Sequence, residues 1–61
     1  LGTAYGHIAL EVDDIHAESA RLVARGVKQT YPPTPMGKSG SIIAFFEDPD
    51  GYKIELIQRP R

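Results

Sequence analysis

The residues Glu47-Asp48-Pro49-Asp50-Gly51-Tyr52-Lys53-Ile54-Glu55-Leu56 predict the end of one strand, a tight turn and a second strand that carries a carboxylate. The Pro-Asp-Gly sequence inside the segment presets φ at the first turn position and then supplies residues that accept a left-handed backbone. Side chains alternate along a strand, so Glu55 faces away from the side that Ile54 and Leu56 share. The face that carries Glu55 therefore needs a structural or functional explanation.

Composition limits the class of protein. The chain has 61 residues, no cysteine, and 7 basic against 8 acidic residues for a net charge of −1. A chain of this length forms one small domain with a marginal core, and the lack of cysteine excludes disulfides and thiolate metal sites. The balanced charge indicates no nucleic-acid partner, and no apolar run approaches the ~20 residues of a membrane span. The chain opens on Leu1 rather than Met, and we expect it to be a piece of something longer.

Alternation, capping and turn signals predict the order β-α-β-β-β. The predicted elements are a strand over 5–12, a helix over 15–25, a weak strand over 27–31, a strong strand over 41–47 and a last strand over 52–58. Asp13 or Asp14 is expected to cap the helix, and Gly26 to end it. The prolines at 32, 33 and 35 lack backbone donors, so residues 32–40 are expected to form a loop.

The helix is expected to place one stripe on the sheet, formed by Ile15, Ser19, Ala20, Leu22 and Val23. We therefore predict an α+β fold: one βαβββ module, with a curved mixed sheet and one helix on one face. The other face would stay open and would carry His7 and Glu55. An open polar face predicts pairing with a second module.

The two residues His7 and Glu55 are also candidate metal ligands. Imidazole and carboxylate suit borderline divalent ions such as zinc, nickel or cobalt. Two ligands are too few for a tight site, so the others must come from another module. A second copy related by a two-fold axis would supply its own His7 and Glu55 and complete a His₂Glu₂ set. Such a site can act as a Lewis acid on a carbonyl.

Two segments, Gly6-His7-Ile8-Ala9-Leu10 and residues 47–57, resemble glyoxalase I of the vicinal oxygen chelate superfamily. The resemblance spans nearly the whole chain and is to the C-terminal βαβββ module of the short, bacterial-type enzyme. It implies that residues 1–61 are half of a glyoxalase-like domain and that the first module is absent from this chain. A separate chain or a homodimer copy would have to supply that module.

The resemblance also implies residue roles. His7 and Glu55 would be metal ligands, and Glu55 would in addition be the general base. The reaction would isomerise the hemithioacetal of methylglyoxal and glutathione to S-lactoylglutathione, with nickel as the favoured divalent metal and zinc or cobalt as alternatives. Lys38 would bind the substrate through its glutathione part. The glutathione and the absence of a targeting segment together predict a cytoplasmic location.

Three alternatives remain open at the level of sequence. One is another enzyme of the same superfamily, such as an epimerase, a dioxygenase or a thiol transferase. The second is a non-catalytic protein of the same fold that binds a small ligand. The third is an inert structural fragment, which would aggregate or be disordered when expressed alone.

Several further polar and aromatic residues are expected to be structural. Glu11 and His16 are predicted to lie exposed without a ligand role. Asp48 and Asp50 fit turn chemistry better than a calcium loop, because the remaining oxygen ligands are missing. The aromatic residues Phe45, Phe46 and Tyr52 are predicted to form core and cup wall.

Overall fold

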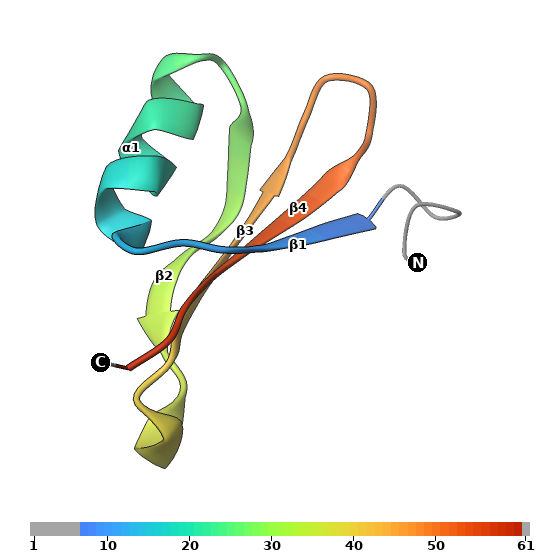
Figure 1. Ribbon diagram of the computed structural model, residues 1–61. Coiled ribbons are helices and arrows are strands. Elements are labelled where there is room, and N and C mark those ends of the chain that lie inside the picture. The colour runs from blue at the N-terminus through green and yellow to red at the C-terminus, as the bar shows by residue number, and fades with distance from the viewer. Residues whose placement is uncertain (1–6, 61) are drawn as a thin grey trace.

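One α-helix packs against a four-stranded sheet in the computed structural model, which describes residues 7–60, with side chains from residue 8 onward (Figure 1). The elements in chain order are β1 (His7–Glu11), α1 (Ile15–Ala24), β2 (Lys28–Pro35), the 3₁₀ turn η2 (Gly37–Ser39), β3 (Ile42–Glu47) and β4 (Lys53–Gln58). The predicted βαβββ order is confirmed, and each strand except β2 ends within two residues of its predicted bounds. The predicted start of the first strand at residues 5 and 6 lies outside the described residues.

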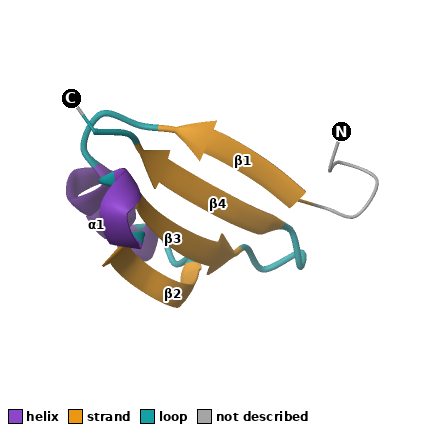
Figure 2. Ribbon diagram, turned by 90° about the horizontal axis from the view of Figure 1, so that it is seen from below, coloured by secondary structure: helices purple, strands orange, loops and turns teal. Residues whose placement is uncertain are grey.

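The strands lie in the order β1-β4-β3-β2. The chain's first and last strands, β1 and β4, are parallel neighbours, whereas β3 runs antiparallel to both β4 and β2. Figure 2 shows the strands curving past one another with α1 on one side only. The predicted mixed sheet with a single covered face is therefore confirmed.

The core lies between α1 and the middle of the sheet. Its buried members are Ile15, Ala44, Phe46 and Leu56, which are 0–2% exposed. Full burial of an Ile, Leu or Phe side chain stabilises a fold by about 1.5–3 kcal/mol, so these few residues supply much of the stability that a small domain has. Within residues 7–60 the helix packs against β2, β3 and β4 rather than β1, and Ile8 and Leu10 on β1 stay 42% and 48% exposed.

Two side chains hold the start of α1. Asp14 is the N-cap, with φ −136° and ψ 94°, and its Oδ1 accepts from the backbone N–H of Ala17 at 3.1 Å. Gln58, at the end of β4, accepts from the N–H of Ile15 through its Oε1 at 2.8 Å. Both N–H groups lack partners within the helix. The hydrogen bond that Ile15 donates to Gln58 ties the first turn of α1 directly to β4.

The other end of α1 closes as a Schellman motif. Gly26 has φ 88°, its N–H donates to the carbonyl of Val23, and the N–H of Val27 donates to the carbonyl of Leu22. A left-handed residue at this position is favourable for glycine because it has no Cβ. The prediction that Gly26 ends the helix is confirmed.

The turn between β3 and β4 depends on Asp48. Its Oδ1 accepts from the backbone N–H groups of Asp50 at 2.9 Å and Tyr52 at 2.8 Å, and its own N–H donates to the carbonyl of Tyr52. Gly51 takes φ 89°. The predicted turn role of Asp48 is confirmed, because its carboxylate is used by the backbone of the turn.

The expectation of a loop over residues 32–40 is wrong for its first half, because β2 continues to Pro35. The ladder to β3 shifts register between Gln29 and Tyr31 and again between Tyr31 and Thr34. These irregularities leave Pro32 and Pro33 out of paired positions. The strand also lies at the edge of the sheet, where a missing N–H costs little.

The predicted helix stripe is right for Ile15, Ser19 and Leu22 and wrong for two residues. Ala20 is exposed, and Val23 is 50% exposed. Ile15, Ser19 and Leu22 are spaced by four and three residues and so lie on one face of the helix. Ala20 and Val23 each follow one of these residues by one position and lie outside that face. Within residues 7–60, no helix is long and apolar enough to cross a membrane.

The cap at Asp14 gives a stability prediction. Asp14→Ala removes the acceptor for Ala17 and should lower the free energy of unfolding by about 1 kcal/mol, measured by thermal or urea unfolding. Asp14→Asn keeps an oxygen at the same place and should stay close to wild type. Equal stability of wild type and Asp14→Ala would show that the Gln58 bond alone sets the helix start.

Candidate functional site

The open face of the sheet, on the side away from α1, carries a row of side chains that crosses all four strands. Strand register places Ala9 opposite Glu55, Glu55 opposite Phe45, and Phe45 opposite Tyr31. Directly opposite residues on one face have Cβ atoms about 4.5–5.5 Å apart. Glu55 therefore lies between a small residue and an aromatic ring.

Burial explains why Glu55 must lie on this face. Its neighbour in sequence, Leu56, is 2% exposed beneath α1, and side chains alternate along β4. Glu55 is half-buried, so part of its surroundings is apolar although no helix covers it. The predicted position of Glu55 on the open face is thus confirmed, whereas its roles as ligand and base stay predictions.

A second row lies next to the first, toward the turn between β3 and β4. Here His7 is opposite Lys53, Lys53 opposite Glu47, and Glu47 opposite Lys28. The row thus carries two ammonium groups against one carboxylate. Among the described residues, neither Lys53 nor Lys28 forms an ion pair with Glu47.

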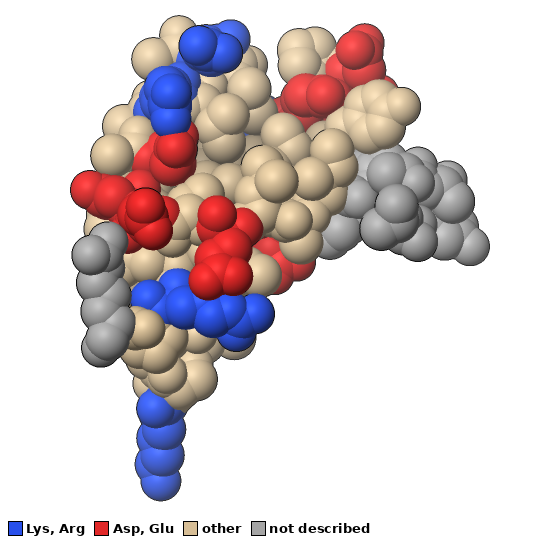
Figure 3. Space-filling model, viewed as in Figure 1, with Lys and Arg blue, Asp and Glu red and all other residues tan. Residues whose placement is uncertain are grey.

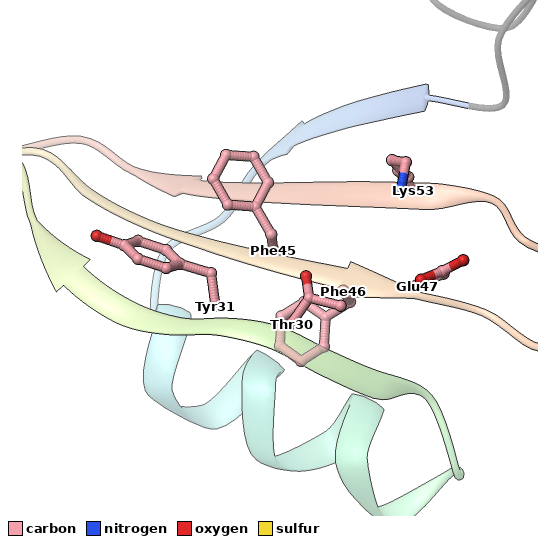
Figure 4. Close-up of a pocket in the computed structure, with 6 residues that line it drawn as sticks. All are labelled: Thr30, Tyr31, Phe45, Phe46, Glu47 and Lys53. Carbon is pink, nitrogen blue, oxygen red and sulfur yellow. The ribbon is translucent and has the colours of Figure 1, made fainter.

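An open cavity of about 360 Å³ adjoins the two rows. Its lining residues are Thr30, Tyr31, Phe45, Phe46, Glu47 and Lys53. Figure 4 shows Tyr31, Phe45 and Lys53 on the side of the sheet away from α1, with Phe46 turned toward the helix. The rings of Tyr31 and Phe45 meet with centroids 5.8 Å apart and planes at 51°, a tilted contact. The cavity thus combines an aromatic wall with charged groups at one end.

The backbone of His7 begins β1 opposite Lys53 and lies two residues before Ala9, the neighbour of Glu55. His7 and Glu55 are therefore diagonal neighbours in the backbone ladder, as the proposed metal pair requires. Among the side chains that the structure describes, no group of three His, Asp or Glu residues lies close enough to hold a metal ion. The ligand roles of His7 and Glu55 stay predictions.

Lys38 lies on η2, exposed, in the connection between β2 and β3. This connection is at the opposite end of the sheet from the turn between β3 and β4 (Figure 1). Along β3, the start of the strand at Ile42 is about 10 Å from Phe45, the neighbour of Glu55, and η2 lies beyond it. The predicted role of Lys38 in substrate binding therefore requires a ligand that extends well past Glu55.

The remaining charged groups lie away from these two rows or near solvent. Glu11 is 64% exposed in its side chain and forms an ion pair with Arg59 at 3.6 Å, which agrees with its predicted exposure. His16 is exposed on α1, as predicted. On the same helix, the hydrogen bonds that Arg21 donates to the Glu18 carboxylate, and then the charge of that carboxylate, raise the pKa of Arg21. Figure 3 shows acidic and basic groups interspersed on the viewed face.

Two residues of the cavity received no functional role from the sequence. Tyr31 was expected at the end of a short strand, and only the continuation of β2 brings its ring against Phe45. Lys53 shares the face of Glu55 by simple alternation, so the pattern already carried that signal. Tyr52, expected as part of core and cup wall, precedes β4 and is 47% exposed.

The sequence matches a family model over residues 2–56, described as Glyoxalase/Bleomycin resistance protein/Dioxygenase superfamily. A probable lactoylglutathione lyase from Synechocystis is 52% identical over 58 residues, which are 95% of this chain and 44% of that protein. A lactoylglutathione lyase from Neisseria meningitidis is 51% identical over 97% of this chain and 43% of its own length. The chain thus spans less than half of the curated relatives it matches.

Solved structures agree with the sequence comparison. A superfamily member from Sphaerobacter thermophilus superposes with a TM-score of 0.74 at 36% identity, over 85% of this chain and 41% of its own. A variant of glyoxalase I from Zea mays gives 0.77 at 41% identity, over 92% of this chain and 20% of its own. The chain belongs to the Glyoxalase/Bleomycin resistance protein/Dioxygenase superfamily.

Proposed function

We propose that this chain is one βαβββ module of a lactoylglutathione lyase, and that the module acts when paired with a second one. The reaction would convert the hemithioacetal of methylglyoxal and glutathione to S-lactoylglutathione. The observation that carries the proposal is the place of Glu55, half-buried on the open face between Ala9 and Phe45. The relatives named lactoylglutathione lyase, about half identical over nearly the whole chain, support it.

The donor set fits a divalent metal in part. His7 and Glu55 would hold the ion, and an imidazole with a carboxylate suits nickel, zinc or cobalt, of which nickel is our first choice. When bound, the metal would stabilise negative charge on substrate oxygens as a Lewis acid. Both positions lie on neighbouring strands, which supports the pairing of these two ligands. Further ligands would come from the second module.

Glu55 itself would transfer the proton. Its carboxylate lies on the open face between Ala9 and Phe45, where a substrate bound on that face would come within its reach. It would take the proton from the carbon that carries sulfur and return it to the neighbouring carbon. The aromatic wall of Phe45 and Tyr31 would limit access of water to that proton.

Pairing is supported by the free side of β1. This strand is bonded to β4 on one edge, and among residues 7–60 no strand pairs with its other edge. Next to that edge, Ile8 and Leu10 expose large apolar side chains on the helix side of the sheet. Exposed edges and apolar patches are typical of surfaces that a partner covers. A separate chain or a second copy would fill this place.

The location of the protein follows from the proposed substrate. A glutathione substrate fits a cytoplasmic location.

The role of Glu55 is tested by Glu55→Gln in the paired, nickel-loaded protein. Loss of the general base should lower kcat by about 10²–10⁴-fold in an assay with methylglyoxal and glutathione. Glu11→Gln, which changes an exposed carboxylate of the same type on β1, should leave kcat near wild type. A protein that only binds a small ligand would show no turnover in any of these variants, and that outcome would refute the lyase proposal.

Metal binding by His7 is tested with the chain's second histidine as the control. His7→Ala should weaken nickel binding by at least about tenfold in calorimetric titration, because a ligand to the ion is lost. His16→Ala removes an exposed imidazole from α1 and should leave the affinity unchanged. Equal loss in the two variants would mean that nickel binds surface histidines nonspecifically.

A further inference from the structure

The row that contains Lys53 has no role in the proposed proton transfer. Lys53 is exposed, begins β4, and lies about 7 Å along the strand from Glu55. It also lines the cavity whose wall is Tyr31 and Phe45. An ammonium that forms no ion pair within the described part of the chain, at one end of an aromatic-walled cavity, suits a ligand that is apolar in the middle and anionic at its end.

Charge balance in the row favours an anion. Lys53 and Lys28 flank Glu47, so two positive charges face one negative charge. Lys53 also lies opposite His7, which would be a ligand of a divalent cation under the proposed function. Two cationic centres on neighbouring strands repel each other, and an anionic group of the ligand between them would relieve that repulsion.

We propose that Lys53 binds a carboxylate of the glutathione part of the substrate, an inference that rests on the proposed function. Glutathione is a tripeptide with its sulfur on the middle residue and carboxylates at both ends. An extended tripeptide spans up to about 10 Å, so a substrate with its reacting carbon at Glu55 reaches Lys53 with one carboxylate. Its other end then points along the sheet toward η2, where Lys38 lies.

This placement makes Lys53 a specificity-determining residue. It selects thiols that carry an acidic group over neutral thiols, and it acts on binding rather than on proton transfer. Loss of the ammonium therefore raises KM and leaves kcat nearly unchanged, in contrast to loss of Glu55. Because Lys53 is exposed and makes no ion pair among the described residues, its replacement does not disturb the fold.

The test measures binding of S-methylglutathione, a thioether that cannot react, to the paired and nickel-loaded protein by calorimetry. Lys53→Gln should weaken binding by roughly three- to tenfold, and Lys53→Arg should keep most of it. Arg25→Gln, which removes an exposed cation at the end of α1 and outside the cavity, should bind as wild type does. The loss caused by Lys53→Gln should also shrink as salt is added.

A second ligand isolates the contact. In the diamide of S-methylglutathione both carboxylates are neutral, so wild type and Lys53→Gln should bind it equally. Equal binding of S-methylglutathione by wild type and Lys53→Gln, or an equal loss with the diamide, would overturn the role of Lys53. Failure of the wild-type protein to bind S-methylglutathione at all would instead overturn the proposed glutathione substrate, and the role of Lys53 with it.

Discussion

The packing of Leu56 beneath α1 is the constraint on which the rest of the structure depends. Leu56 is 2% exposed in the core, and the two-residue period of a strand then sends Glu55 to the opposite face. A shift of one residue in β4 would exchange the two and place a carboxylate beneath the helix. The same contact that stabilises the fold thus places the acidic group of the candidate site. The core and the candidate site thus both depend on β4, which carries Leu56 on one face and Glu55 on the other.

Both ends of β4 are fixed by side-chain hydrogen bonds. At its start, the carboxylate of Asp48 holds the preceding turn, and at its end the amide of Gln58 holds the first turn of α1. The first contact closes the turn that joins β4 to β3, and the second joins β4 to the helix. Both rows on the open face depend on the register of β4 against β1 and β3. This register places His7, Lys53 and Glu55 at neighbouring positions.

Sequence patterns predicted the features that depend on neighbouring residues in the chain, namely the helix caps, the turn and the alternation along a strand. Asp14, Gly26 and the turn around Asp48 follow from capping and turn preferences, and the face of Glu55 follows from alternation. The course of β2 did not follow, because three prolines argue against a strand unless its position at the sheet edge is known. The place of Tyr31 in the aromatic wall depends on that strand and was missed with it, whereas Phe45 was expected as part of the cup wall. Exposure of Val23 likewise depends on how α1 lies across the sheet.

The open face of one module alone would not provide enough ligands for tight metal binding. Under the proposed function the chain would supply two ligands, His7 and Glu55, whereas divalent metals of this class bind tightly with about four. In the proposed pairing, a second module would add at the outer edge of β1, beside the exposed Ile8 and Leu10. Metal binding and pairing should therefore be linked, because the second module would supply the missing ligands and the bound metal would hold the two modules together.

The most direct test of this linkage is the light-scattering mass of the chain at increasing nickel concentration. It would be measured alone and with the part of the Neisseria relative that the match leaves out. We expect nickel to raise the mass above the 6.7 kDa of one chain, by dimer formation or by binding of the added module. A particle that stays at 6.7 kDa in both mixtures while binding nickel tightly would contradict the account, because one module would then hold the metal alone.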